Sequence, residues 1–412
     1  MLPLYEILIY HSYMLSERDL FFRHLAQTSE APLALEIQRA EGIFLFDVSG
    51  KSYLDLISGI SVSNVGHRHP HVLRAINSQL DLYLHLMVYG EYIQSPQVQL
   101  AQKLASILPA ELQSCYFVNS GSEAIEGALK LAKRYTGRSG IYSFKNAYHG
   151  SSHGALSVMG NESFKQAFRP LLPDIHFLEI NNKADINRID ENTACVVIEP
   201  IQGEAGVISV TTEFLSSLRI RCNETGTLLI FDEIQSGFGR TGKMFAFEHF
   251  GVIPDILTLA KAMGGGMPIG TFISSPAIMN SLSCSPVLGH ITTFGGHPVS
   301  CAAAIASVEV LLNEKLIESV SEKEALFLNL LGNHPLVKEF RSRGLLIALE
   351  MENFETNKRV IDNAIKNGVI VDWFLFNPQS MRIAPPLTIT LREIETACDL
   401  LRASMDEVLQ NS

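Results

Sequence analysis

The sequence predicts an α/β protein with a large domain, built on a mostly parallel seven-stranded sheet, and a small α+β domain. The chain has 412 residues, enough for about two or three domains. Its middle part alternates short apolar runs with helix-like segments, as in buried parallel strands joined by helices. Both ends of the chain mix helical and alternating patterns instead, which indicates a separate α+β unit.

The N-terminal part begins with an extension, residues 1–14. It is fairly apolar, but it contains Glu6 and His11 and lacks a basic start and a small-residue cleavage site, so we expect no signal peptide. Ser16 and Asp19 are spaced as at the start of a helix. Residues 35–57 alternate and turn at residues 47–50, which predicts an antiparallel hairpin.

The middle part supplies the seven strands and three long helices. Ile125, Ala128, Leu129 and Ala132 recur at helical spacing, and Gly137 is typical of a helix end. The predicted helices are 122–135, 212–225 and 299–313, and the predicted strands are 115–118, 140–144, 175–178, 194–198, 228–231, 256–259 and 270–274.

The C-terminal part, residues 306–412, mixes helices with short strands near 345–351 and 381–383. We therefore expect residues 65–305 to form the large domain. The small α+β domain is then built from both chain ends, residues 15–64 and 306–412.

Composition excludes several classes of protein. The net charge is −11 and no basic block stands out, so we expect no nucleic-acid partner. No run of about eighteen apolar residues is present, so we expect no membrane span. The six cysteines lie far apart without a CxxC pair or a Cys/His cluster, which predicts neither a metal site nor a disulfide framework and fits a cytoplasmic protein.

Residues with reactive or charged side chains follow several predicted strands. Asp232 and Glu199 each follow an apolar run, and Lys261 follows a third. Gly121 and Ser122 join a strand to a helix, where free N–H groups favour an anion. Ligands of open α/β sheets bind beyond the carboxyl ends of the strands, where these residues are expected.

Each of these features is common by itself, since an Asp can cap a turn and a Lys is usually solvated. Together they match the needs of pyridoxal 5′-phosphate (PLP): a phosphate cup, a carboxylate for the pyridine nitrogen, an amine for the aldehyde carbon and an aromatic plate. A desolvated lysine such as Lys261, just before Gly264-Gly-Gly266, can form a Schiff base. Tyr148 is the candidate plate.

The sequence resembles the class III aminotransferases of the ornithine, acetylornithine, 4-aminobutyrate and ω-amine type, which have PLP fold type I. The similarity runs from about residue 33 to 387, and the large domain is therefore expected to bind PLP. The motifs that carry the resemblance are Gly66-His-Arg-His-Pro70, Asn119-Ser-Gly-Ser-Glu-Ala124, Tyr148-His-Gly150, Glu199-Pro-Ile-Gln-Gly-Glu-Ala-Gly206, Phe231-Asp-Glu-Ile-Gln-Ser-Gly-Phe-Gly-Arg-Thr-Gly242, Leu259-Ala-Lys-Ala262, Thr292-Thr-Phe-Gly-Gly296 and Met381-Arg-Ile-Ala-Pro-Pro386.

The resemblance implies roles for individual residues. Lys261 matches the lysine that binds PLP covalently, and Asp232 matches the partner of the pyridine nitrogen. Glu204 and Arg382 match a switch pair, in which the Arg binds the keto-acid carboxylate and the Glu neutralises it at other times. The cofactor-binding set is completed by Gln235 near the ring hydroxyl, Gly121 and Ser122 at the phosphate, Tyr148, and Thr293, which reaches the phosphate of the other subunit of a homodimer with shared sites.

Two positions depart from the ornithine-type pattern. Ser151 stands where those enzymes resemble one another in having an arginine clamp, and Ile60 stands where they have an aromatic residue. A donor with a distal α-carboxylate loses its partner at Ser151. The sequence therefore favours ω-amine and diamine donors.

We interpret the chain as an aminotransferase that moves an amino group from an ω-amino donor, a diamine or an ω-amino acid, to an α-keto acid such as 2-oxoglutarate or pyruvate. The alternatives are an acetylornithine or ornithine aminotransferase, and a PLP aminomutase or decarboxylase on the same fold. A PLP-binding protein without turnover is disfavoured because Lys261, Asp232 and Arg382 are all present. A nicotinamide dehydrogenase is disfavoured because no GxGxxG opens an early helix.

Overall fold

The computed structural model describes residues 15–411, so the predicted extension 1–14 lies outside the described residues. The first helix, α1 (Glu17–His24), begins as predicted. Ser16 accepts a hydrogen bond from the N–H of Asp19, and the Asp19 carboxylate accepts one from the N–H of Ser16. This capping box satisfies N–H groups that the first helical turn leaves without partners.

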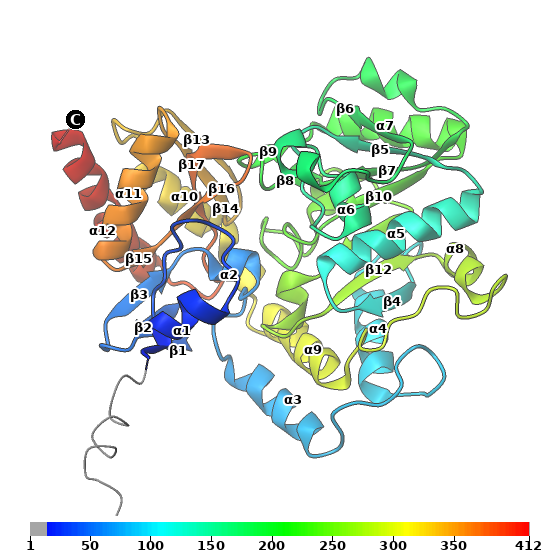
Figure 1. Cartoon of the computed structure of the whole chain (residues 1–412), viewed down its shortest axis with the longest axis horizontal. Coiled ribbons are helices and arrows are strands. Elements are labelled where there is room, and N and C mark those ends of the chain that lie inside the picture. The colour runs from blue at the N-terminus through cyan, green and yellow to red at the C-terminus, as the bar shows by residue number, and fades with distance from the viewer. Residues whose placement is uncertain (1–14, 412) are drawn as a thin grey trace, which may run out of the picture.

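A seven-stranded sheet forms the centre of the larger lobe (Figure 1), with strand order β4-β12-β11-β10-β7-β5-β6. All pairs are parallel except those of β12, which runs antiparallel to both of its neighbours. The predicted fold class and all seven strands are confirmed. The strands are β4 (Ser114–Val118), β5 (Gly140–Phe144), β6 (Ile175–Leu178), β7 (Thr193–Ile198), β10 (Leu228–Asp232), β11 (Ile256–Leu259) and β12 (Gly270–Ser274).

Helices lie against this sheet, and the three long predicted ones are present within one residue of their expected ends. In α5 (Gly121–Thr136), Ser120 caps the start and Gly137 ends the helix with a left-handed φ of 70°. The others are α7 (Thr212–Thr225) and α9 (Pro298–Asn313). Shorter helices of this lobe are α3 (Pro70–Leu80), α4 (Ser95–Ile107), α6 (His153–Ser157) and α8 (Pro276–Met279), with 3-10 turns at η1 (Glu162–Phe164), η2 (Gln166–Phe168), η3 (Asp185–Arg188), η4 (Ala246–His249), η5 (Lys261–Gly264) and η6 (Asn280–Ser283).

The smaller lobe combines segments from both chain ends, so the blue N-terminal strands lie beside the orange and red C-terminal helices in Figure 1. One four-stranded sheet has the order β1-β2-β3-β15, in which β15 pairs in parallel with β3. The other has the order β13-β14-β17-β16. The elements of the smaller lobe are β1 (Ile37–Glu41), β2 (Phe44–Asp47), β3 (Ser52–Asp55), α2 (Ser58–Ser61), η7 (Leu316–Ser319), α10 (Val320–Leu331), β13 (Glu339–Arg343), β14 (Leu346–Glu350), α11 (Phe354–Lys366), β15 (Val369–Ile370), β16 (Asp372–Phe374), β17 (Asn377–Ile383) and α12 (Leu391–Gln410).

The single hairpin expected at residues 35–57 is corrected by the structure. Strands β1, β2 and β3 form a three-stranded antiparallel meander, because Gly42, with a φ of 60°, makes an additional turn before the predicted one at 47–50. The domain boundaries at 64/65 and 305/306 stay predictions.

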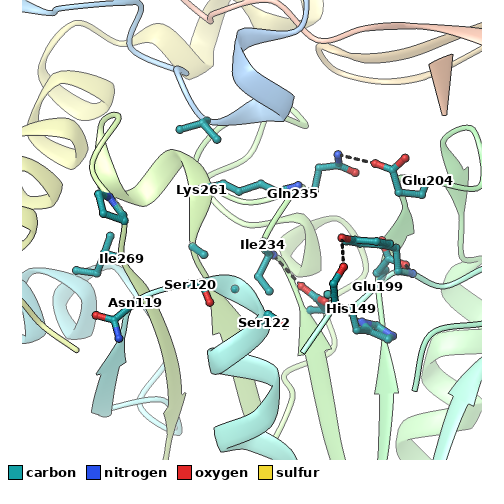
Figure 2. A pocket seen from close by; sticks show the side chains of 18 of the residues that line it. Asn119, Ser120, Ser122, His149, Glu199, Glu204, Ile234, Gln235, Lys261 and Ile269 are labelled. Atoms are coloured by element: carbon teal, nitrogen blue, oxygen red, sulfur yellow. Dashed lines mark hydrogen bonds and ion pairs between the residues drawn. The ribbon is translucent and has the colours of Figure 1, made fainter. Parts of the chain in front are cut away.

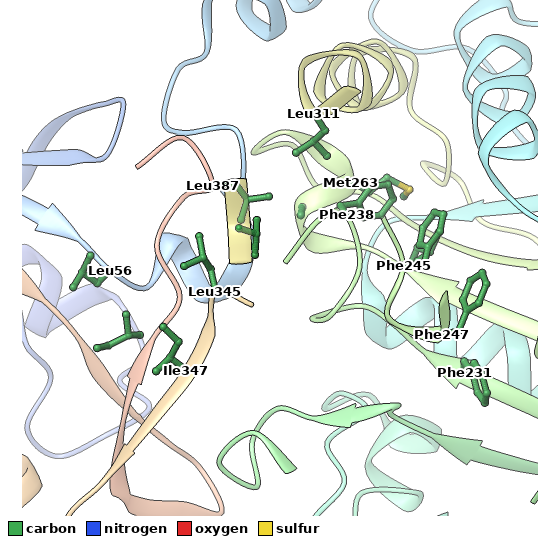
Figure 3. Packing of buried hydrophobic residues seen from close by; sticks show 14 of the residues in the cluster. Leu56, Phe231, Phe238, Phe245, Phe247, Met263, Leu311, Leu345, Ile347 and Leu387 are labelled. Carbon is green, nitrogen blue, oxygen red and sulfur yellow. The ribbon is translucent and has the colours of Figure 1, made fainter. Parts of the chain in front are cut away.

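One continuous apolar core joins the two lobes. Figure 3 shows Phe231, Phe245 and Phe247 on the side of the large sheet, and Leu56 and Ile347 on the side of the smaller lobe. All five side chains belong to the same buried cluster. The interface between the two lobes is therefore filled by closely packed apolar side chains. None of the helices within residues 15–411 is both long and apolar enough to cross a membrane.

Candidate active site

A cavity of about 560 Å³ opens at the carboxyl ends of the parallel strands. In Figure 2, Lys261, Gln235 and Glu204 lie along one side of it, and Ser120 and Ser122 lie at the start of α5 on the opposite side. Its size is within the range usual for sites of small molecules and cofactors. The predicted site residues that line it are Gly121, Ser122, Tyr148, Ser151, Glu204, Asp232, Gln235 and Lys261.

The start of α5 forms the anion-binding end of the cavity. The N–H groups of Gly121 and Ser122 belong to the first helical turn, where a helix leaves N–H groups without internal partners. Gly150 brings the next loop very close, since a Cβ there would lie 2.5 Å from Ser122 Oγ. This position also has a φ of 123°, which favours glycine. The contact confines a bound anion between the loop and the helix.

The Ser122 hydroxyl is oriented from behind by two residues that the sequence analysis did not place in the site. Ser152 Oγ donates to Glu126 Oε1 (2.7 Å), and Ser152 N–H donates to Ser122 Oγ (3.0 Å). Because the Ser152 hydroxyl has only one proton, Ser122 is the donor in the 2.6 Å contact between the two hydroxyls. Ser122 thus carries a proton that it now donates to Ser152. Rotation of the Ser122 hydroxyl would direct this proton to an anion in the cavity.

Asp232 ends β10 with its carboxylate in the cavity wall. His149 Nδ1 lies 2.8 Å from Asp232 Oδ2, and the N–H of Ile234 donates to Oδ1 (3.0 Å). Both side chains are buried. Buried carboxylates need such partners, and these contacts fix the direction in which the remaining lone pairs point.

Lys261 follows β11 in an uncommon backbone conformation. Its φ is 46°, in the left-handed region that a residue with a side chain seldom adopts. Such strain is concentrated at functional sites, where the surrounding structure imposes it. Burial lowers the pKa of Lys261, and the negative charge of Glu204 opposes this effect only in part. The residue therefore offers a more nucleophilic amine than a surface lysine.

Tyr148 and Glu199 form another wall of the cavity. Glu199 Oε2 accepts from the N–H of Tyr148 (3.0 Å), and Oε1 accepts from the N–H of Gly203 (3.1 Å). Burial, with the nearby Asp232 charge, raises the pKa of Glu199 well above its usual range. The carboxyl group thus fixes both loops, including the one that carries Tyr148.

Glu204 closes the end of the cavity nearest the smaller lobe. Arg382 holds it with two hydrogen bonds, NH1 to Oε1 (3.0 Å) and NH2 to Oε2 (2.9 Å). Gln235 Nε2 donates to Oε1 (3.4 Å), and the N–H of Leu375 donates to Oε2 (3.0 Å). Burial alone would raise the pKa of Glu204, but Arg382 and the Leu375 N–H outweigh it and hold the pKa below the usual value.

Three predicted site residues are not among those that line the cavity. Arg382 is buried behind Glu204. Ile60 lies in α2 with a φ of 66°, and Thr293 is exposed on this chain. Ser151 does line the cavity, with its hydroxyl 3.3 Å from that of Tyr148.

Comparison with known proteins adds the family. The model of "Aminotransferase class-III" matches residues 25–405. The putrescine aminotransferase of Pectobacterium atrosepticum is 41% identical over 379 residues, covering 87% of this chain and 80% of the relative. The acetylornithine aminotransferase of Archaeoglobus fulgidus is 37% identical over 380 residues, covering 92% and 97%. An amine transaminase from an uncultivated Pseudomonas species, crystallised in its PLP-bound form, has a TM-score of 0.85 at 29% identity, covering 93% of this chain and 98% of that one.

The fold and these similarities define a PLP-dependent transaminase of fold type I. The chain belongs to the class-III aminotransferase family, and it is a PLP-dependent aminotransferase. The residues present fit the cofactor. The start of α5 suits a phosphate, the Asp232 carboxylate suits a protonated ring nitrogen, and the desolvated Lys261 amine suits an aldehyde carbon.

Proposed function

We propose that this enzyme transfers an amino group from an ω-amino donor, a diamine or an ω-amino acid, to an α-keto acid such as 2-oxoglutarate or pyruvate, in two half-reactions. One observation carries the choice of donor. No arginine is among the described residues that line the cavity, because Arg382 is reached only by displacing Glu204. While that pair is closed, a donor with no α-carboxylate suits the site best.

Two residues carry the proton and charge chemistry in this proposal. When bound, PLP would supply an electron sink for the carbon that carries the donor amine. Lys261 would hold the cofactor through its amine, and that amine, when free, would accept and return the proton lost from this carbon. Asp232, fixed by His149, keeps the ring nitrogen protonated.

The remaining cofactor contacts come from the walls of the cavity. Gly121 and Ser122 bind the phosphate, Tyr148 covers the ring, and Gln235 lies at its hydroxyl group. Thr293 serves the phosphate site of the other subunit, which requires a homodimer with shared active sites. Its exposure on this chain supports that role.

Substrate choice depends on Ser151, Ile60, Glu204 and Arg382. Ser151 offers a hydroxyl where a second carboxylate clamp would need a charged fork. Arg68, a basic residue of the motif at residues 66–70, is exposed and is not among the cavity-lining residues. The similarity to a putrescine aminotransferase supports a diamine donor.

A second candidate is an acetylornithine or ornithine aminotransferase, which the 37% identical relative favours. It requires an additional clamp for the α-carboxylate of the donor. A PLP aminomutase or decarboxylase on the same fold would release no carbonyl product from the donor and would form no amino acid from a keto-acid acceptor. We place the enzyme in the cytoplasm because its separate cysteines suit a reducing compartment.

A donor panel tests the proposal. Putrescine, an ω-amino acid, acetylornithine and ornithine are each paired with 2-oxoglutarate and with pyruvate, and the amino acid formed from the acceptor is measured directly. We expect the donors without an α-carboxylate to have the higher kcat/KM. A wide preference for acetylornithine would favour the second candidate, and loss of donor without amino-acid formation would contradict transamination.

A further inference from the structure

The side of Arg382 that faces away from Glu204 is also fully surrounded. Strand β16 pairs with β17 so that Asp372 lies directly opposite Arg382. Asp372 Oδ1 forms an ion pair with Arg382 Nε at 3.1 Å without the alignment of a hydrogen bond, and the Trp373 carbonyl accepts a hydrogen bond from NH2 (3.1 Å). The guanidinium carbon lies over the Phe374 ring, 4.7 Å from its centroid. Three consecutive residues of β16 thus contact Nε, NH2 and the guanidinium carbon of one side chain.

The two carboxylates at Arg382 differ in where they can go. Glu204 lines the cavity, whereas Asp372 is not among the lining residues. The Asp372 side chain is short and starts from a paired strand, so it has little freedom to leave. Glu204 has a longer side chain and carries two of its four contacts on the same guanidinium. Glu204 is the partner that a substrate carboxylate can replace.

We propose that Asp372 is a positioning residue for the acceptor half-reaction: it holds Arg382 by Nε, so that the NH1/NH2 edge stays aimed at the cavity after Glu204 has left. This rests on the proposed function, in which a keto-acid carboxylate takes the place of Glu204. A buried guanidinium that loses its only anion is strongly destabilised. With Asp372 in place, Arg382 keeps one anion throughout the exchange.

The charges around Asp372 agree with this role. Burial raises the pKa of Asp372 to about 6, with Glu204 and Asp55 adding to the rise and Arg382 opposing it. Asp55 is itself paired with His67, 2.7 Å away. A pKa of about 6 leaves most of Asp372 ionised at neutral pH. With Glu204 in place, two carboxylates share one guanidinium, and departure of Glu204 leaves a balanced pair rather than an isolated charge.

Binding of glutarate, a dicarboxylate that cannot accept an amino group, tests the proposal in the PLP-loaded enzyme by calorimetry. Asp372→Ala should raise the Kd for glutarate roughly tenfold, the size of a lost charged contact. Asp372→Asn, which keeps an oxygen beside Nε, should stay within about threefold of the unmodified enzyme. The single-turnover rate with a monoamine donor should fall much less than the rate with the keto acid. Glu355→Ala, which removes an exposed carboxylate in the first turn of α11 of the same lobe, is the control and should leave the Kd unchanged.

Thermal unfolding supplies a measurement without catalysis. Glu204→Gln and Asp372→Asn each leave Arg382 one anion, whereas the double variant leaves none. The double variant should lose about 4 °C more in Tm than the sum of the two single losses.

Three results would overturn the role of Asp372 alone: an unchanged or tighter glutarate Kd in Asp372→Ala, an equal fall in both half-reactions, or additive Tm losses. An unmodified enzyme that makes no amino acid from any keto acid would instead overturn the proposed function, and this proposal with it.

Discussion

Arg382 and Glu204 lie 178 residues apart in the chain and meet as a buried two-point pair, NH1–Oε1 at 3.0 Å and NH2–Oε2 at 2.9 Å. The backbone around Glu204 is fixed to the smaller lobe, since its carbonyl accepts from the N–H of Phe376 (3.0 Å) and the Gly206 carbonyl accepts from Arg341 Nε (2.8 Å). An exchange at this end of the cavity therefore involves the Glu204 side chain rather than its backbone. The pair closes one end of the cavity, and a substrate carboxylate has to displace the Glu204 carboxylate to reach Arg382.

Glu204→Gln should separate the two half-reactions. The amide removes the carboxylate from the NH1/NH2 edge of Arg382, so a donor without a carboxylate leaves that edge facing the cavity without an anion, while the keto acid no longer competes with Glu204 for it. We expect kcat/KM for a diamine to fall roughly tenfold to a hundredfold, equivalent to about 1.5–3 kcal/mol, and the Kd of the keto acid to stay equal or fall. Single-half-reaction kinetics measure both. A loss confined to the keto-acid half-reaction would contradict the switch.

Asp232→Asn should keep the cofactor and lose the chemistry. An Asn side chain can retain a contact with His149 but cannot hold a proton on the ring nitrogen by charge. We expect turnover to fall by about a hundredfold or more, as when a preorganised charge is removed from a reacting group. The bound PLP, measured by absorbance after gel filtration, should remain near one per chain. Near-normal turnover would show that Asp232 only caps β10.

Glu126→Ala should loosen the phosphate end of the site without touching the cavity. Its carboxylate accepts from Ser152 Oγ and from the N–H groups of Gly154 and Ala155. Losing these partners costs about 1–3 kcal/mol and releases the Ser152–Ser122 contact. PLP should therefore leave on dilution roughly tenfold faster. Glu213→Ala, an exposed acidic residue in the first turn of α7, is the control and should not change that rate.

Ser151→Arg should move donor preference toward ornithine-like substrates. The serine lines the cavity, so a guanidinium there can supply the charged fork that the site lacks. A charge-assisted pair contributes about 2 kcal/mol, or roughly thirtyfold in the ratio of kcat/KM for acetylornithine to that for putrescine. Ser163→Arg adds the same charge at an exposed position outside the cavity lining and should leave the ratio unchanged. If the unmodified enzyme already prefers acetylornithine widely, another residue is the clamp.

The large sheet was predictable because its strands are buried on both faces. Runs such as Thr193–Ile198 and Ile256–Leu259 are buried at every position and read as continuous apolar segments. Short strands escaped prediction, since β15 has two residues and owes its existence to pairing with β3. The second turn at Gly42 also escaped, because an exposed glycine does not by itself indicate where a strand ends.

The site was predictable where motifs carried it and not where it depends on contacts between distant segments. Tyr148, Gln235 and Lys261 were predicted and line the cavity. Asp372, Glu126 and the pairing of His149 with Asp232 were missed, because each acts through a residue far away in sequence. His149 was visible only as part of the motif around Tyr148. For Asp372, the strand pairing that sets it opposite Arg382 is the signal, and it exists only in the fold.

Lys261 is the lysine proposed to carry the cofactor, and borohydride reduction followed by peptide mapping identifies the lysine that does so. The PLP-loaded enzyme is reduced, digested and searched by mass spectrometry for the lysine that gains the cofactor mass. Its position after β11, its left-handed backbone and its lowered pKa predict one modified peptide, containing Lys261, and none in Lys261→Ala. A reduced adduct on any other lysine of the unmodified enzyme would contradict the assignment of Lys261.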